Sequence, residues 1–257
     1  MKYLRRFFTG ILITWSLIAF TVMMFICAPV IILGNLINNR FGFLLMSCAE
    51  KLWAIGFMTL CGVFIFRHNK KSVGKEKAYI FVSNHNSYLD ATGIGWSIPR
   101  PFKPLGKIEM TKVPLFGYLY KHAVVVIDRK SPESRSESVK KLKQVLKRGM
   151  SILLFPEGTM NRDLNVPLEK FYDGAFRIGI QTQTPIAPMV IVNARTLLPR
   201  NNPLDHFRPG ILHVYFIDPV QTKGLTLDDV PMLRDKVHGL METKIKEKQK
   251  ILIKIKQ

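Results

Sequence analysis

The sequence contains few cysteines and none of several common catalytic patterns. Its three cysteines, Cys27, Cys48 and Cys61, lie in the apolar N-terminal region without the spacing of a metal site. The rest of the chain has no cysteine, which excludes a cysteine nucleophile there. G-x-S-x-G, H-E-x-x-H and Walker A patterns are also absent, which argues against a serine-elbow hydrolase, a zinc protease and a P-loop nucleotide hydrolase. We therefore expect no metal ion and no bound cofactor.

Acidic residues are scarce as well. The 257-residue chain has 18 Asp and Glu against 38 Lys and Arg, a formal net charge of +20. This excess predicts an anionic partner, which is nucleic acid, an acidic membrane surface or a phosphorylated substrate. A hydrophobic fraction of 47% and a mean hydropathy of +0.12 favour the membrane. The absence of a recognised nucleic-acid-binding motif argues against nucleic acid.

A long apolar run begins near the N-terminus. Residues 10–37 are almost unbroken apolar sequence, longer than the roughly 20 residues that a bilayer core requires. The run is also too long for a signal peptide, and Pro29 directly follows the one plausible cleavage point, Cys27-Ala28. We therefore predict an anchor that is not cleaved.

A second apolar stretch covers residues 41–66, but Glu50 and Lys51 interrupt it. Each charge at mid-bilayer costs roughly 2.5 to 3.5 kcal/mol on insertion scales. A helix lying shallowly in one leaflet is therefore favoured over a second full span, which would need the two charges to pair. Basic residues flank the region on both sides: Lys2, Arg5, Arg6, Arg67, Lys70, Lys71, Lys75 and Lys77. This pattern predicts a membrane-anchoring two-helix region over residues 1–70, with both ends on the cytoplasmic side.

Short apolar runs alternate with helical patterns in the remainder. Residues 79–83, 123–128, 151–155, 186–192 and 211–217 are rich in Val, Ile and Phe and too short for helices. Residues 134–148 have helical spacing behind a Ser-x-x-Glu start. The alternation predicts an α/β domain over residues 71–257, with a mostly parallel sheet flanked by helices. Residues 230–257 read as a basic terminal helix, either solvated or in contact with anionic headgroups.

Two motifs follow predicted strands, where sites gather in such sheets. The strand 79–83 runs into NHNSYLD, residues 84–90. His85 in the turn and Asp90 on the next helix would form a general base with its orienting partner, although a purely structural hydrogen bond is an alternative. The strand 151–155 runs into PEGTMNR, where Arg162 follows a turn with free backbone N–H groups. Arg129 and Lys107 would add cations to the same rim.

NHNSYLD, then VVIDR, FPEGT and TPIAP in this order, resembles the 1-acyl-sn-glycerol-3-phosphate acyltransferases, one group of glycerolipid acyltransferases. The resemblance covers roughly residues 78–218, and the apolar N-terminal third looks like the two-helix membrane motif of that family. It implies that His85 is the general base and Asp90 its partner. It also implies a substrate-binding set and an acyl-donor side: Lys107, Arg129, Phe155, Pro156, Glu157, Gly158, Thr159 and Arg162 for the first, and Pro185 and Pro188 for the second.

Two positions depart from the family pattern. Ala123 stands where the second motif usually opens with Gly, and Tyr172 stands where a basic residue is common two positions before the Gly of FYDGA. The second change makes the acceptor headgroup less certain.

The resemblance implies transfer of a fatty acyl group from acyl-CoA or acyl carrier protein to the sn-2 hydroxyl of 1-acyl-glycerol-3-phosphate. The partners would be the lysophospholipid, the thioester donor and an anionic surface of the inner membrane, with the site on the cytoplasmic side and no nucleic acid. The sequence leaves the donor, chain length and oligomeric state open. The alternatives are another lysophospholipid, glycerol 3-phosphate or an aminolipid as acceptor, an inactive scaffold, and a non-enzymatic membrane-anchored binding protein.

Overall fold

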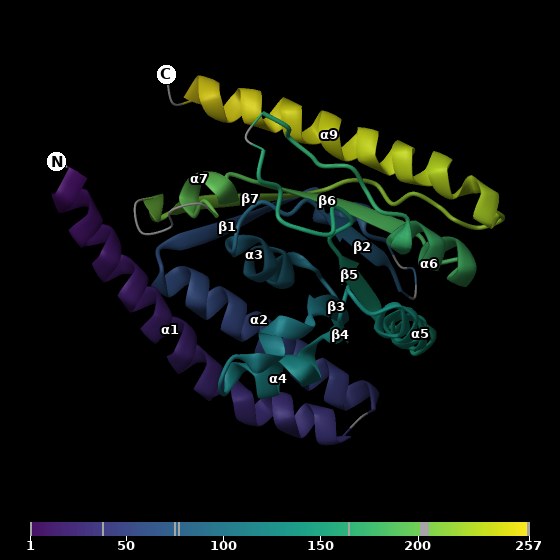
Figure 1. Cartoon of the computed structure of the whole chain (residues 1–257), viewed down its shortest axis with the longest axis horizontal. Helices are drawn as coiled ribbons and strands as arrows, with labels where there is room; N and C mark the ends of the chain where they lie inside the picture. The colour runs from purple at the N-terminus through teal and green to yellow at the C-terminus, as the bar shows by residue number, and fades with distance from the viewer. Residues whose placement is uncertain are drawn as a thin grey trace.

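The computed structural model describes residues 2–37, 39–74, 76, 78–163, 165–200 and 206–255. Its centre is a seven-stranded sheet in the order β1-β7-β6-β2-β5-β3-β4, with helices on both faces (Figure 1). Neighbouring strands are parallel except for the antiparallel pair β6 and β7. The strands are β1 (Val63–His68), β2 (Ile80–Ser83), β3 (Phe102–Lys107), β4 (Val125–Ile127), β5 (Ser151–Leu154), β6 (Ile186–Val192) and β7 (Gly210–Phe216). The predicted fold class is therefore confirmed.

Side chains of alternate strand residues point to opposite faces and build two cores. Ile80 and Val82 of β2 join a core covered by α5, α6 and α9, whereas Phe81 joins a core covered by α2 and α3. The helices are α1 (Lys2–Ile37), α2 (Arg40–Leu60), α3 (Leu89–Ser97), α4 (Phe116–Ala123), α5 (Pro132–Lys147), α6 (Gly174–Thr182), α7 (Ala194–Leu197) and α9 (Val230–Ile255). Short 3₁₀ turns are η1 (Lys70–Ser72), η2 (Ile108–Lys112) and η3 (Leu227–Asp229).

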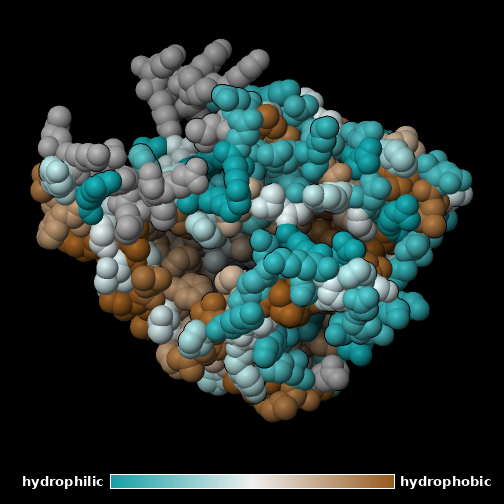
Figure 2. Space-filling model, viewed as in Figure 1, coloured by the Kyte–Doolittle hydropathy of each residue, from teal (hydrophilic) through white to brown (hydrophobic). Residues whose placement is uncertain are grey.

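The N-terminal helices form an antiparallel hairpin along one side of the domain (Figure 1). Two segments, Arg6–Ile37 and Phe41–Leu60, are long and apolar enough to cross a membrane. α1 leaves large hydrophobic side chains exposed along its length, among them Phe7, Phe8 and Phe25. Figure 2 shows hydrophobic residues gathered at the lower left, over α1. The hairpin thus has a free apolar face beside the predominantly hydrophilic surface of the other helices.

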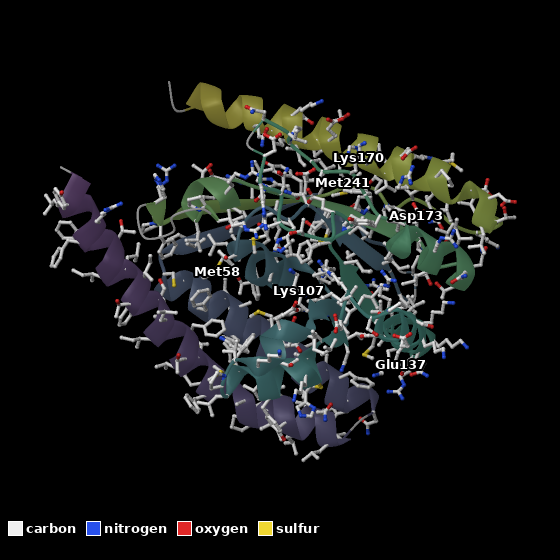
Figure 3. The ribbon with its side chains drawn as sticks, viewed as in Figure 1. Met58, Lys107, Glu137, Lys170, Asp173 and Met241 are labelled. Atoms are coloured by element: carbon white, nitrogen blue, oxygen red, sulfur yellow. The ribbon has the colours of Figure 1, made fainter. Side chains whose placement is uncertain are left out.

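The second helix packs against both α1 and the sheet domain. Met58 of α2 (Figure 3) is fully buried and accepts a weak hydrogen bond from Thr92 of α3, with Thr92 Oγ1 3.4 Å from the sulfur. Glu50 interacts electrostatically with Lys103 of β3, which places this interrupting charge on the domain side. Burial lowers the pKa of Lys103, and the Glu50 charge partly offsets this shift.

Several elements differ from the sequence-based predictions. The second apolar helix ends at Leu60 rather than near residue 66, and only Cys61 and Gly62 separate it from β1. β1 lies within the predicted anchoring region 1–70 yet pairs with β7, so the domain boundary at residue 70 stays a prediction. The strand expected from residue 123 begins at Val125, because Ala123 closes α4. Lys75 and Lys77, two of the flanking basic residues, lie outside the described residues.

Candidate active site

The predicted base sits in the turn between β2 and α3. The strand ends at Ser83, and the buried Asn84 then extends its pairing through a side chain. Asn84 Nδ2 donates to the Ile191 carbonyl at 3.0 Å, and the Ile191 N–H donates to Asn84 Oδ1 at 2.8 Å. An amide side chain presents the same donor and acceptor as a peptide group, so it mimics one more strand residue beside β6. The chain therefore enters the turn from a fixed position.

His85 and Asp90 meet across this turn. His85 Nδ1 lies 2.9 Å from Asp90 Oδ2. The same carboxylate oxygen accepts the backbone N–H groups of Asn86 at 2.6 Å and Ser87 at 2.7 Å. The Asp90 side chain is fully buried, whereas that of His85 is 18% exposed. Because Asp90 holds the proton on Nδ1, Nε2 of the neutral imidazole is the lone-pair acceptor.

Phe155 fixes the plane of the imidazole. The two rings stack with centroids 4.3 Å apart and planes inclined by 23°. Phe155 follows β5, the strand paired with β2, so the two parallel strands bring Phe155 and His85 to the same edge of the sheet. With Asp90 on one nitrogen and Phe155 on one face, the imidazole has little rotational freedom.

Glu157, predicted to help hold the acceptor, is engaged by the backbone on both carboxylate oxygens. Oε1 accepts the His85 N–H at 2.6 Å, and Oε2 accepts the Glu169 N–H at 2.9 Å. The residue is 3% exposed. The Asn161 N–H donates to the His85 carbonyl at 2.7 Å, so the PEGTMN segment holds both backbone polar groups of the base.

Burial raises the pKa of Glu157 to about 7, although the N–H groups of Glu169 and His85 favour its charged form. A raised folded-state pKa adds stability that is present below about pH 4.5 and is lost as pH rises to about 7. Relative to Glu157→Gln, the wild-type free energy of unfolding should therefore fall by about 3 kcal/mol between pH 4 and pH 8. Denaturant titration of both proteins in one detergent measures this, and a pH-independent difference would contradict it.

The PEGT turn depends on Gly158. Its φ of +71° lies in the left-handed region that favours glycine, and a Cβ there would lie 2.7 Å from the Tyr172 ring. The Tyr172 N–H donates to the buried Pro156 at 2.9 Å through the proline carbonyl. Thr159, one residue on, is exposed. The position at which the sequence departs from the family pattern thus packs directly on the turn.

The predicted cations divide into two groups on either side of the base. Lys107 (Figure 3) is the last residue of β3, and Arg129 follows β4. Both interact with Tyr120, whose pKa burial raises to about 12. The Lys107 backbone hydrogen-bonds with Tyr120, and Arg129 interacts electrostatically with Glu109, Tyr120 and Tyr172. Arg162 is exposed on the loop after β5, which Arg195 ties to the α7 side.

Two prolines were assigned to the acyl-donor side: Pro185 lies directly before β6, and Pro188 lies within it. The Pro185 carbonyl accepts the N–H of Ile80, the first residue of β2, at 3.0 Å. Pro185 is therefore at the opposite end of the sheet from His85, about 17 Å away along the strand direction. Pro188 pairs with Val82 in the buried middle of β6.

The structure adds residues to the site that the motifs did not single out. Ser87, Tyr120 and Asn161 contact the backbone or side chains of predicted site residues, and Asn84 fixes the start of the turn by pairing with Ile191. Asn84 and Ser87 lie within NHNSYLD, so their position in this motif is the sequence signal that could have identified them. Within the described ranges, no group of three or more His, Cys, Asp or Glu side chains is arranged to hold a metal ion.

A partly exposed imidazole beside a buried carboxylate, at the carboxyl edge of a parallel sheet, is an arrangement suited to general-base chemistry in an α/β protein. A family model described as Acyltransferase matches residues 64–192, half of the sequence. The chain belongs to this acyltransferase family.

Individual relatives agree with this assignment. The 1-acyl-sn-glycerol-3-phosphate acyltransferase of Cocos nucifera is 34% identical over 176 residues, 68% of this chain and 56% of that protein. The 1-acyl-sn-glycerol-3-phosphate acyltransferase alpha of Homo sapiens is 33% identical over 174 residues, 67% of this chain and 60% of that protein. The chain thus spans less than two thirds of the length of these curated relatives.

A solved structure shares the fold. The crystal structure of the 1-acyl-sn-glycerophosphate (LPA) acyltransferase PlsC from Thermotoga maritima matches with a TM-score of 0.78 at 20% identity. The match covers 97% of this chain and 98% of that one, so the similarity includes the N-terminal helical hairpin as well as the sheet domain.

Proposed function

We propose that the protein transfers a fatty acyl group from a thioester donor to the sn-2 hydroxyl of 1-acyl-glycerol-3-phosphate, giving phosphatidic acid. The observation that carries the proposal is the 2.9 Å contact between His85 Nδ1 and the buried Asp90 carboxylate. The names of relatives that are 33–34% identical support the choice of acceptor.

In the proposed mechanism, Nε2 of His85 removes the proton from the acceptor hydroxyl as its oxygen attacks the thioester carbonyl. Asp90 stabilises the imidazolium that forms, because its carboxylate already accepts the Nδ1 proton. The tetrahedral intermediate then expels the thiolate, which takes the proton from His85. The acyl group passes directly between substrates, so no covalent acyl-enzyme forms.

Substrate binding is proposed for the residues that the family resemblance implied. Lys107, Arg129 and Arg162 supply positive charge, and Phe155 to Thr159 form the wall of the site next to the base. Glu157 acts there through the His85 backbone, since both of its oxygens are engaged. Pro188 would shape the donor side through the β6 backbone, and Pro185 from the far end of that strand. The donor is acyl-CoA or acyl carrier protein.

Membrane attachment fits substrates and products that reside in a bilayer. The exposed apolar side chains of α1 support insertion of the hairpin, and the net charge of +20 supports contact with an anionic surface. In this proposal the active site lies on the cytoplasmic side of the inner membrane, in keeping with the basic residues at both ends of the region.

The proposal is tested with the full chain in detergent micelles and radiolabelled acyl-CoA or acyl carrier protein. The acceptors are 1-acyl-glycerol-3-phosphate, glycerol 3-phosphate, lysophosphatidylcholine and lysophosphatidylethanolamine. We expect phosphatidic acid as the main product, with the first acceptor preferred. Preferred acylation of any other acceptor would replace the proposed substrate, and no transfer with either donor would reject the activity.

A further inference from the structure

The segment that follows β6 approaches the base from the side opposite Lys107 and Arg129. Ser87, two residues after His85, donates through Oγ to the Leu198 carbonyl at 2.7 Å and forms a β-bridge with Pro199. The next residue, Arg200, donates through Nη1 to the Met160 carbonyl at 3.1 Å. A short stretch of chain therefore touches both motif turns of the site.

These contacts set an upper limit on the distance between the Arg200 guanidinium and His85. Met160 is bonded to Asn161, whose N–H donates to the His85 carbonyl at 2.7 Å. Given standard peptide geometry, Arg200 Nη1 lies within about 8 Å of the His85 carbonyl oxygen. Arg129 follows β4, whose axis lies about 14 Å from that of β2, and interacts electrostatically with Tyr172, the residue that packs on Gly158.

The covalent structure of the acceptor limits how far its phosphate can lie from the hydroxyl that reacts. In 1-acyl-glycerol-3-phosphate, four bonds separate the sn-2 oxygen from phosphorus, so the two atoms are at most about 5 Å apart. A cation that holds the phosphate while the hydroxyl meets His85 must therefore reach close to the base. Arg200 approaches His85 through these backbone contacts, and a planar guanidinium can hold a phosphate through two parallel N–H groups.

The charge of Arg200 is available for this task. Its hydrogen bond to Met160 goes to a neutral carbonyl and uses one guanidinium nitrogen, whereas the group carries five N–H donors. The ion pairs found among the described residues do not involve Arg200. Arg200 is half-buried, so water screens its charge less than that of an exposed arginine.

We propose that Arg200 binds the phosphate of the acceptor. The inference rests on the proposed function for its substrate, but it adds a residue that belongs to none of the sequence motifs. The neighbouring Arg195 donates from both terminal nitrogens to the carbonyls of Asp163 and Asn161, and so positions the loop that carries Arg162.

The test compares two acceptors that differ only in the phosphate. kcat/KM is measured for 1-acyl-glycerol-3-phosphate and for the phosphate-free 1-acylglycerol, in wild type, Arg200→Met and Arg200→Lys. We expect Arg200→Met to lose about ten- to a hundredfold on the phosphate-bearing acceptor, mainly through KM, and to change little on the other. Arg200→Lys should recover part of the loss. Equal losses on both acceptors, or none, would overturn the proposal.

Arg100→Met is the matched control. Arg100 is also half-buried and donates to the backbone carbonyls of Gly74 and Glu76, but it precedes β3 at the far end of the sheet. The Arg100→Met variant should leave the preference between the two acceptors unchanged.

Equilibrium binding of labelled 1-acyl-glycerol-3-phosphate separates the proposed role of Arg200 from the proposed acyltransferase activity. Binding that is lost in Arg200→Met supports the inference even without turnover, whereas unchanged binding rejects it.

Discussion

Replacing His85 by alanine should lower kcat for acyl transfer by about 10²–10⁴-fold, the usual contribution of a positioned general base. Alanine removes the Nε2 lone pair while the backbone bonds of the turn to Glu157 and Asn161 can persist. KM for the acceptor should change much less, because the predicted phosphate-binding cations stay in place. The measurement is steady-state formation of phosphatidic acid by the purified full chain in detergent.

His122→Ala provides the control for loss of an imidazole. His122 lies in the last turn of α4 beside Tyr118, with ring centroids 5.0 Å apart. Among the contacts found in the described residues, none joins it to the motif turns. Activity near the wild-type level is expected for this variant. Full activity in His85→Ala, with circular dichroism showing both variants folded, would remove His85 from the mechanism.

Asp90→Asn should cost a comparable factor, roughly 10²–10⁴ in kcat, because it disturbs the imidazole in either orientation of the amide. If the Asn oxygen replaces Oδ2, it keeps the N–H groups of Asn86 and Ser87 but no longer offers a negative charge to the imidazolium. If the amide is reversed, its NH₂ group faces three donors and forces His85 into the tautomer that lacks a free Nε2.

The pH profile separates these effects from a loss of folding. In Asp90→Asn the alkaline limb of kcat/KM should retain residual activity, since hydroxide can replace the base, whereas an unfolded protein would have none. Asp235→Asn, on the exposed face of α9, should leave kcat unchanged. A rate for Asp90→Asn within threefold of wild type would show that the carboxylate is structural only.

Periodicity located the buried strands but missed the two that lack a simple pattern. β6 is buried at every residue, and its apolar run was sufficient to place it at residues 186–192. β3 contains two lysines, a proline and a glycine and is mostly half-buried, so nothing in its composition separates it from a loop. β1 continues the apolar run of α2 after Cys61 and Gly62, and hydropathy alone shows no break there.

The candidate site likewise contains residues that the sequence could predict and residues that only the packed fold brings together. His85 and Asp90 are five residues apart in one turn, so local spacing predicted their contact. The roles of Asn161 and Arg200 depend on the approach of segments 76 and 115 residues after the base, which only the packed sheet establishes. The family resemblance implied that Glu157 helps to hold the substrate, and a motif alone does not reveal that two backbone N–H groups engage its carboxylate.

The short link between α2 and β1 has a mechanical consequence. Two residues cannot act as a flexible tether, and Met58 of α2 is packed on α3, the helix that bears Asp90. If the hairpin inserts as proposed, its depth in the bilayer sets the height of the imidazole above the lipid tails. Hydrophobic mismatch costs fractions of a kcal/mol per Å, so membranes of different thickness would present the sn-2 hydroxyl at different levels. We therefore expect turnover in the proposed reaction to vary with bilayer thickness without any change in the protein.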